Sequence, residues 1–504
     1  MSDPPAAPAV SRGDVARGAG LAGLARAGAL IEAVAQPLFV WLYGLATYGL
    51  YVALWGAVNL VSNIVDLSMT SALQRVVPGE SEEERVHGAV KAALLVAVLP
   101  AMLIAAVVSW QAEAIAGIFS AAPEDRDSLP FLIALFVWAL PLWTFVEVAT
   151  SAARARRAFG PEIRLRIFWE QIARIGFALL FFLAGLGSIG LAAAHLASLA
   201  LTVLLCLPLL ARYYDLRRLA RARVRPVLGV LVPTGLALLP ANVARRLLID
   251  APPFLLNLML PGTQGAVAAG LFEIARKIAT IPLIVRQAFQ YVMAPLAAAQ
   301  ARADRAEIGP LYRFACRVST AMVVPLAGLL IFAGRDILSV YRPEAMAALP
   351  LLVILVSARA AEAVAGPATP IVEMTGHRAL PLLNSLLAAL VWGVLAFLLV
   401  PRQGALGMAI ATAAATLAAT FAATLELRIA DRLSPFDRSL FAGLAIALAG
   451  VAAMALAAEA ASGPVRFALV LALWAGTSWT ALRFGLAAAD RAALGGFART
   501  LRLT

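Results

Sequence analysis

Residues 262–300 read GTQGAVAAGLFEIARKIATIPLIVRQAFQYVMAPLAAAQ, and this stretch decides the fold. It is long and apolar enough to span a membrane. On a helix that turns 100° per residue, its polar side chains share one half of the surface and Ile, Val and Phe occupy the other. A charge that faces lipid at mid-bilayer costs about 2.5–3.5 kcal/mol. We therefore expect this helix to line a polar space inside the membrane with Glu273, Arg276, Lys277, Arg286 and Gln287.

The stretch just before it places further charges in an apolar run, namely Arg245, Arg246 and Asp250. Two consecutive helices thus carry five basic and two acidic residues at membrane depth. Pairs four residues apart, Arg246 with Asp250 and Glu273 with Lys277, would neutralise two of the cations within their own helices. Three cations remain. They favour a water-filled cavity with a cationic wall over a purely structural set of ion pairs.

Composition places the whole chain in a membrane. Of 504 residues, 62% are hydrophobic and 14% are charged, against roughly 25% charged in soluble domains. Apolar runs of roughly 20 residues follow one another and predict fourteen transmembrane helices. The two cysteines lie in apolar runs and the three histidines lie apart, so the sequence indicates no disulfide framework, metal site or cofactor. The predicted fold class is an all-α integral membrane protein.

Basic residues alternate from loop to loop along the chain. Most of the 41 Lys and Arg fall in every second loop and in the two tails. The intervening loops hold only Arg126, Arg335, Arg342, Arg402 and Arg466. This pattern predicts that both termini are cytoplasmic. The net charge of +12 then reflects topology and an anionic inner leaflet, and a nucleic-acid partner is not required.

Three landmarks recur at nearly one spacing. Residues 48–51 (YGLY) correspond to 269–272 (AGLF), residues 155–164 to 372–381, and residues 187–191 (GSIGL) to 404–408 (GALGM). Such a repeat predicts two parallel six-helix lobes around a central cavity, followed by two extra helices. The expected divisions are a cytoplasmic tail at 1–20, an N-lobe at 21–211, a basic cytoplasmic linker at 212–226, a C-lobe at 227–430, and two last helices with a cytoplasmic tail at 431–504.

The repeat gives the polar stretch a partner in the first half. Asn59, Asn63, Asp66 and Thr70 lie on one helical face. We expect Asn59 and Asn63 to join the cations as substrate-binding residues. The acids and one pair in the tenth span are candidates for ion coupling or a gate: Glu32, Asp66, Glu147, Asp250, Glu273, Arg359 and Glu362. Arg166, Glu170 and Arg174, spaced by four residues, predict a structural row of ion pairs.

Residues 47–78 and 270–300, with the loops ARARRAFG and EMTGHRALPLLN, resemble the matching segments of bacterial oligosaccharide flippases and lipopolysaccharide or exopolysaccharide transporters. These belong to the multidrug/oligosaccharidyl-lipid/polysaccharide exporter superfamily, and the resemblance covers nearly the whole chain. It implies a V-shaped pair of lobes that moves a polyprenyl-diphosphate-linked glycan across the bacterial inner membrane. It also implies membrane lipids and the polysaccharide polymerase or export machinery as partners.

Two other classes of function have a basis in the sequence. A cation-coupled exporter of small cationic compounds would use Asp66, Glu32 and Glu147, although the cationic second half would repel its substrates. Asp125-Arg126-Asp127 has the form of a metal-binding motif of glycosyltransferases, but its short loop predicts a solvated acidic turn. Since no P-loop motif occurs either, we expect a transporter and not an enzyme.

Overall fold

A computed structural model of the chain describes residues 31, 34–156, 158, 163–284, 308–374, 379–494 and 496–503. Within these ranges the chain is helical and contains no strand. Eleven of the described helices are long and apolar enough to cross a membrane. Three shorter ones, Val34–Tyr43, α10 (Glu170–Leu183) and α14 (Gly262–Ile278), correspond to the other expected spans. The chain is a multi-pass membrane protein, and the predicted all-α fold class is confirmed.

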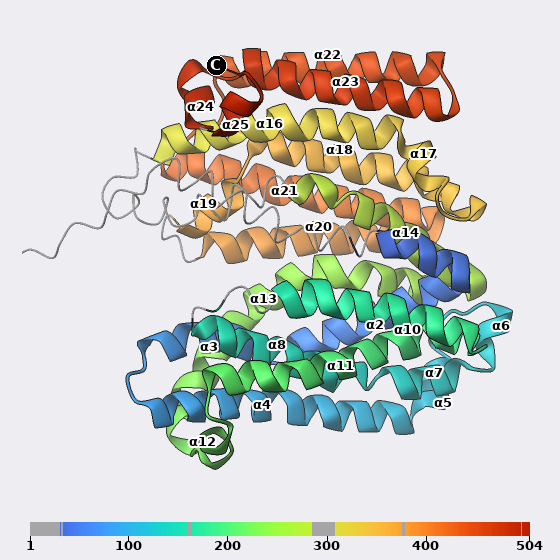
Figure 1. The fold of residues 1–504 in the computed structure, drawn as a ribbon, viewed down its shortest axis with the longest axis vertical. Helices are drawn as coiled ribbons and strands as arrows, with labels where there is room; N and C mark the ends of the chain where they lie inside the picture. The colour runs from blue at the N-terminus through green and yellow to red at the C-terminus, as the bar shows by residue number, and fades with distance from the viewer. Residues whose placement is uncertain are drawn as a thin grey trace, which may run out of the picture.

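The long helices run side by side in two stacked bundles (Figure 1). The lower bundle comes mainly from the first half of the chain. Its helices are α2 (Leu45–Val65), α3 (Met69–Val76), α4 (Glu83–Trp110), α7 (Leu129–Phe136), α8 (Ala139–Ala155), α10 and α11 (Ile189–Tyr213). Short helices join them at the bundle ends: η1 (Val77–Gly79), α5 (Ala112–Ala116), α6 (Pro123–Arg126), η2 (Ile163–Trp169) and α12 (Leu216–Arg221).

The upper bundle comes from the second half. Its helices are α14, α16 (Ile308–Phe332), α18 (Leu349–Ala365), α19 (Ala368–Met374), α20 (Leu380–Gln403) and α21 (Ala405–Ala430). The last long pair, α22 (Arg438–Ala460) and α23 (Gly463–Phe484), lies along α16 at the top of Figure 1. The remaining short helices are α17 (Gly334–Leu338), η4 (Pro343–Ala348), α24 (Ala488–Ala493) and α25 (Gly496–Thr500). The residue boundaries of the two predicted lobes stay a prediction.

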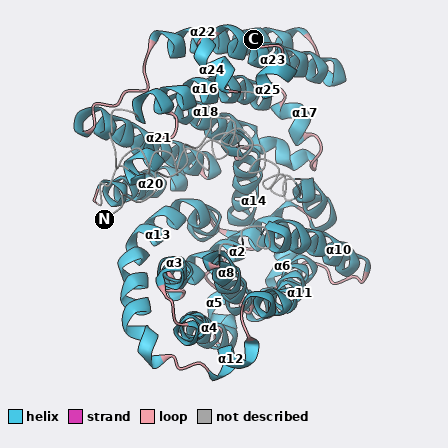
Figure 2. Ribbon diagram, turned by 60° about the vertical axis from the view of Figure 1, so that its left-hand side comes forward, coloured by secondary structure: helices cyan, strands magenta, loops and turns pink. Residues whose placement is uncertain are grey.

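One helix, α13 (Arg225–Met259), links the bundles. It is continuous over 35 residues although four prolines lie in its interior, and Figure 2 shows it following a curved path beside the lower bundle. Prolines remove backbone hydrogen bonds, which accounts for the curvature. Val227 and Leu231 near its start pack into the core of the lower bundle. The helix also contacts α14 and α20 of the upper bundle.

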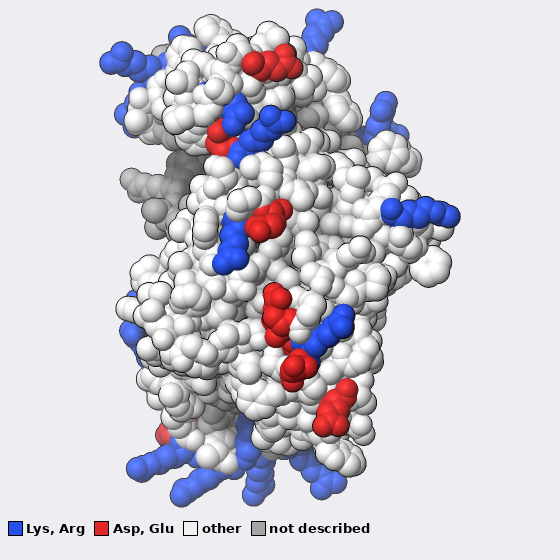
Figure 3. All heavy atoms as spheres, turned by 90° about the vertical axis from the view of Figure 1, so that its right-hand side faces the viewer, with Lys and Arg blue, Asp and Glu red and all other residues white. Residues whose placement is uncertain are grey.

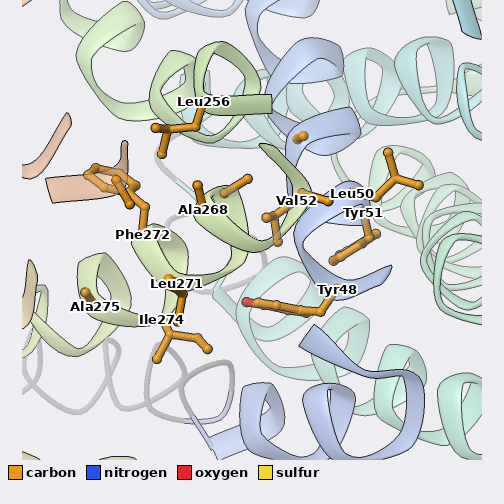
Figure 4. Packing of buried hydrophobic residues seen from close by; sticks show 14 of the residues in the cluster. Tyr48, Leu50, Tyr51, Val52, Leu256, Ala268, Leu271, Phe272, Ile274 and Ala275 are labelled. Atoms are coloured by element: carbon orange, nitrogen blue, oxygen red, sulfur yellow. The ribbon is translucent and has the colours of Figure 1, made fainter. Parts of the chain in front are cut away.

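The two repeated stretches meet where the bundles join. A Cβ atom at Gly49 of α2 would lie 1.8 Å from the carbonyl oxygen of Ala266 in α14. A Cβ atom at Gly270, the repeat equivalent of Gly49, would lie 3.3 Å from the Cα atom of Gly49. The two backbones therefore touch, as helices in membranes do where both residues are small. Figure 4 shows the side chains around this contact, Tyr48, Leu50, Tyr51 and Val52 of α2 and Ala268, Leu271, Phe272, Ile274 and Ala275 of α14.

The third repeated landmark, residues 187–191 and 404–408, also has equivalent geometry in both halves. Gly187 has φ +55° and Gly404 has φ +56°, a left-handed conformation that glycine adopts without steric cost. Gly187 comes just before α11, and Gly404 comes directly before α21. The matching glycines thus precede α11 and α21, the helices predicted to end the two lobes.

Candidate functional site

The polar face of the second span surrounds a break between α2 and α3. Leu67 has φ +47° and Ser68 has φ +55°, values that cost a non-glycine residue roughly 1–3 kcal/mol. The Asp66 carboxylate stabilises the break because it accepts hydrogen bonds from the Ser68 amide at 2.8 Å and the Thr70 hydroxyl at 3.3 Å. These bonds satisfy the backbone amide of Ser68, just before α3, and the side-chain hydroxyl of Thr70, in its first turn. Asp66 is thereby fixed at an interruption of a transmembrane helix.

A cavity of about 320 Å³ lies beside this break, and we call it the arginine cavity. Its walls come from α3, α8 and η2 on one side and from α13 on the other. Among the described residues that line it, four are arginines and two are carboxylates. The lining is Asn63, Asp66, Ser68, Thr70, Ser71, Gln74, Glu147, Arg154, Arg166, Asn242, Arg245 and Arg246.

A second cavity, of about 150 Å³, lies farther along α2 toward its start, and we call it the aromatic cavity. α2 contributes aromatic rings, and α10, α13 and α14 contribute charges. Its lining includes Tyr48, Tyr51, Trp55, Asn59, Arg174, Asp250, Glu273, Arg276 and Lys277. The Asn63 side-chain amide, in the arginine cavity, donates to Asp250, in the aromatic cavity, at 3.1 Å. The structure thus brings ten of the fifteen residues proposed from the sequence to two adjoining cavities.

Within the arginine cavity, Arg245 and Arg246 have different partners. Arg245 donates to the Asn242 side-chain oxygen at 2.7 Å, and the Asn242 amide donates to the Ser68 hydroxyl at 3.0 Å. Arg246 lies 3.7 Å from the Glu147 carboxylate, so the Arg246–Asp250 pair expected from spacing is not the one formed. Spacing along α13 was misleading because an acid on α8 reaches the same guanidinium. Neutral side chains therefore hold Arg245 against the helix break.

In the aromatic cavity, the acid of α14 has two cationic neighbours. Glu273 accepts two hydrogen bonds from Arg276, at 2.8 and 2.7 Å, and lies 3.9 Å from the Lys277 amine. The pairing of Glu273 with Lys277 expected from the sequence is present, but it is the longer of the two contacts. All three side chains line the cavity, which agrees with the predicted polar face of this helix.

Three arginines that line the cavities were not among the site residues proposed from the sequence. Arg166 and Arg174 were expected in a structural row of ion pairs, and Arg154 was not proposed for any role. Arg154 and Arg166 line the arginine cavity, and Arg174 lines the aromatic cavity. The Glu170–Arg174 part of the expected three-residue row is present. Arg166 lies 3.4 Å from Glu147 and stacks over the Trp143 ring at 4.4 Å. The four-residue spacing was visible in the sequence, but the spacing could not show that this face of the helix turns toward a cavity.

Arg174 is held by a buried network of hydrogen bonds and an ion pair. His195 is fully buried, and its Nδ1 lies 2.9 Å from the Tyr51 hydroxyl, which lines the aromatic cavity. Arg174 donates to the same hydroxyl at 3.5 Å and pairs with Glu170. A histidine expected to be incidental is therefore part of the hydrogen-bonded support of a cavity cation.

Some predicted site residues lie elsewhere. Arg359 donates to Glu362 at 2.9 Å within α18, and neither residue is among the described lining of the two cavities. Three predicted residues, Glu32, Arg286 and Gln287, fall outside the described residues. The structure describes residues 262–300 only as far as Ile284, so the expected equivalence of Asp66 and Gln287 stays a prediction.

The acidic loop near α6 differs from its prediction. Asp125 is fully buried, and the Thr47 hydroxyl lies 3.2 and 3.1 Å from its two carboxylate oxygens. Burial raises the pKa of this carboxyl above its usual range. The interpretation of Asp125 as part of a solvated turn was wrong because Thr47, 78 residues earlier, folds over it. The burial also leaves Asp125 no open coordination space of the kind a metal-binding motif needs.

On the side of α6 and α17, hydrogen bonds join residues 36–41 to residues 340–342. Trp41 Nε1 donates to the Val340 carbonyl at 2.8 Å, and Arg342 donates to the Trp41 carbonyl at 2.7 Å. The Tyr341 hydroxyl donates to the Gln36 side chain at 3.3 Å, and Gln36 lines the aromatic cavity. We call these contacts the 36–342 latch. It joins the helix Val34–Tyr43, the first that the structure describes, to the loop after α17.

No protein-family model matches the chain, and no curated protein matches it. Solved structures do. A lipid II flippase, MurJ, in an inward closed conformation is similar with a TM-score of 0.72 at 12% identity, over 92% of this chain and 97% of that chain. The Vibrio cholerae MATE transporter VcmN in its bent form is similar with a TM-score of 0.56 at 15% identity, over 84% of this chain and 98% of that chain.

An inward-facing multidrug resistance MATE family transporter of the MOP superfamily is also similar, with a TM-score of 0.56 at 15% identity, over 84% of this chain and 95% of that chain. These similarities define the class of fold. The chain has the all-α fold that is shared by this lipid II flippase and the MATE transporters. The fold implied by the resemblance of residues 47–78 and 270–300 is confirmed.

Proposed function

We propose that the protein flips an anionic polyprenyl-diphosphate-linked oligosaccharide across the bacterial inner membrane by alternating access. The observation that carries this proposal is the arginine cavity, where Arg154, Arg166, Arg245 and Arg246 surround a polar space of about 320 Å³. Guanidinium groups bind phosphate oxygens in bidentate fashion, and these charge-assisted bonds are stronger than neutral ones. A membrane-embedded space of this composition suits a diphosphate.

The origin of the four arginines supports a role in transport. Arg154 and Arg166 belong to the first half of the chain, and Arg245 and Arg246 belong to α13. A bound diphosphate would contact both sets, so its affinity would depend on how α13 sits against α8 and η2. A ligand shifts a conformational equilibrium only through such a difference in affinity between states.

The aromatic cavity suits the glycan. Tyr48, Tyr51 and Trp55 provide flat apolar surfaces, and Asn59 provides hydrogen-bonding groups. Pockets of mixed apolar surface with a few placed polar groups are typical of small-molecule sites. Arg174, Arg276 and Lys277 would add contacts to acidic sugars or to the second phosphate.

The proposed setting follows the charge pattern of the loops. Both termini would be cytoplasmic, and the 36–342 latch would then close the outer side of the cavities. The glycan delivered outside would enter lipopolysaccharide or exopolysaccharide assembly, where a polymerase or export machinery is the expected partner.

Deletion of the gene tests the cargo. Accumulation of a polyprenyl-diphosphate oligosaccharide on the inner face, with loss of surface polysaccharide, is the expected result. Unchanged lipid-linked saccharides would contradict the proposal.

Variants test the site. We expect Arg245→Gln/Arg246→Gln and Arg276→Gln to lower surface polysaccharide at normal membrane levels, because a hydrogen bond to a charged group contributes about 1.5–3 kcal/mol, or roughly tenfold or more in affinity. Arg402→Gln, at an exposed arginine outside both cavities, is the matched control. Full activity of both cavity variants would return these arginines to a structural role.

A cation-coupled exporter of small compounds is the second candidate. Asp66, Glu147 and Asp250 at the cavities favour it, because a proton or Na⁺ requires carboxylates at membrane depth. The same gene deletion distinguishes the two functions. Increased sensitivity to cationic drugs with normal lipid-linked saccharides would support the exporter.

A further inference from the structure

The segment 212–225, which we call the arm, leaves α11, forms α12 and enters α13. It carries six exposed arginines within fourteen residues, namely Arg212, Arg217, Arg218, Arg221, Arg223 and Arg225. Its apolar residues divide between two faces, since Leu219 is buried and Leu216 is 40% exposed. The arm is therefore a short amphipathic element whose free face is almost entirely cationic.

The arm is held rigidly on α4. The Nε2 atom of His87 accepts a hydrogen bond from the Asp215 amide at 3.2 Å, and the Lys91 amine donates to the carbonyls of Ala220 and Ala222 at 2.6 and 3.2 Å. Lys91 thus satisfies carbonyls at the end of α12 that have no partner within the helix. Both side chains lie on one face of α4, four residues apart.

The backbones of the arm and α4 also fit closely. A Cβ atom at Gly88 would lie 2.6 Å from the carbonyl oxygen of Arg223, so only glycine allows this approach. At the other end, the Asp215 carboxylate accepts from the amides of Arg217 and Arg218 at 2.8 and 3.2 Å. These bonds hold the pKa of Asp215 below its usual range. The arginines are consequently presented in a fixed arrangement.

The nearby acids, Asp215, Glu83 and Glu84, are too few to neutralise the six arginines of the arm. Asp215 lies 3.6 Å from Arg218. Glu83, the acid of α4 that is next to His87 in space, accepts two hydrogen bonds from Arg156, at 2.8 and 2.6 Å, and Arg156 lies outside the arm. Figure 3 shows Lys and Arg side chains projecting past the lower end of the molecule, the end where α12 lies in Figure 1. The face remains strongly cationic.

We propose that the arm binds the phosphate headgroups of anionic lipids. Both helices that it connects, α11 and α13, are long and apolar enough to cross a membrane, so the arm lies at the level of the headgroups on one face of the bilayer. Clusters of four to eight basic residues beside a transmembrane helix attract anionic lipid. The exposed Leu216 beside them can enter the acyl boundary. This inference is independent of the cargo.

The test uses the full chain reconstituted in phosphatidylcholine nanodiscs with a fluorophore at Ala220→Cys. Both native cysteines are buried, which favours selective labelling. Nitroxide-bearing phosphatidylglycerol or phosphatidylcholine is added at equal mole fraction, and quenching reports the local concentration of each lipid. A matched fluorophore at Val465→Cys, 62% exposed at the start of α23, reports the background.

We expect phosphatidylglycerol to quench Ala220→Cys several-fold more strongly than phosphatidylcholine, because each arginine contributes roughly fivefold at low salt. Arg217→Gln/Arg218→Gln/Arg221→Gln/Arg223→Gln leaves only Arg212 and Arg225 in the arm and should lower the ratio several-fold. Removal of the same charge at four exposed arginines outside the arm, Arg402, Arg428, Arg432 and Arg438, should leave the ratio high.

Lys91→Met keeps every arginine and releases the end of α12, so it should lower the ratio without a change in the charge of the arm. Equal quenching by the two lipids in the wild-type sequence would overturn the proposal. So would a high ratio in the fourfold arm variant, because the preference would then come from charge outside the arm.

Discussion

Replacement of Gly49 by alanine places a methyl group inside the contact between α2 and α14. The new Cβ atom would lie 1.8 Å from the Ala266 carbonyl oxygen and 2.9 Å from the Gly270 amide nitrogen. Both are backbone atoms, so no side chain can rotate away and the helices must separate. Overpacking of this kind costs about 1–3 kcal/mol, and the cost here should lie at the upper end of that range.

The controls separate this steric cost from the ordinary preference of helices for alanine. Gly393 in α20 has no atom within 4 Å of its added Cβ, so Gly393→Ala should stabilise the protein by roughly 0.5–1 kcal/mol. Gly270→Ala meets the Leu45 carbonyl oxygen at 3.0 Å and should cost less than Gly49→Ala. The expected order of stability is Gly393→Ala, wild type, Gly270→Ala, Gly49→Ala.

The assay is thermal unfolding of purified protein in one detergent at one scan rate. A change of 1 kcal/mol shifts the midpoint by about 2–4 °C in mid-sized domains, so Gly49→Ala should unfold several degrees below Gly393→Ala. Equal midpoints for these two variants would show that α2 and α14 do not touch at these glycines.

Two further predictions concern the latch and Asp125. Thiol cross-linking of Gln36→Cys/Tyr341→Cys with a short reducible bis-thiol reagent should stop the proposed flipping activity until reductant is added. Cross-linking of Asp336→Cys/Arg466→Cys should not, because the native Asp336 and Arg466 already bond at 2.6 Å between α17 and α23, away from the latch. Activity of the cross-linked latch would show that the latch need not open. Burial raises the pKa of the Asp125 carboxyl above 3.8 in the folded state. The folded protein therefore binds the carboxyl proton more tightly than the unfolded chain does. The protonated Asp125 thus contributes to stability at low pH, and this contribution is lost as pH rises through the raised pKa. Asp125→Asn should therefore unfold at a higher temperature than wild type at pH 7 and lose this advantage toward pH 4; a difference that does not change with pH would contradict the burial of this carboxyl.

Periodicity found much of the site because helices in a bilayer must turn charges away from lipid. The face that holds Glu273, Arg276 and Lys277, and the one that holds Asn59, Asn63 and Asp66, follow from this constraint alone. The repeat located Gly49 and Gly270 as equivalents, although it did not indicate that they touch.

The features that sequence reasoning missed depend on tertiary contacts. Arg166 pairs with Glu147 on a different helix, and Asp125 is covered by Thr47, and neither partner can be read from local spacing. The break at Leu67 and Ser68 contains no glycine or proline. Its one local signal is Asp66 two residues before Ser68, since aspartate often bonds to the backbone two residues on and favours a turn.

The position of Gly49 along α2 has a mechanical consequence. The 36–342 latch lies on one side of this contact, and the helix break at Asp66 lies on the other. At 1.5 Å per residue, Asp66 is about 25 Å from the contact along α2, whereas Gly44, just before α2 on the latch side, is about 8 Å from it. If α2 and α14 rock about their touching glycines, the contact acts as the fulcrum of a lever with unequal arms. Movement of α2 on the latch side would then be accompanied by a larger movement, in the opposite direction, at the arginine cavity.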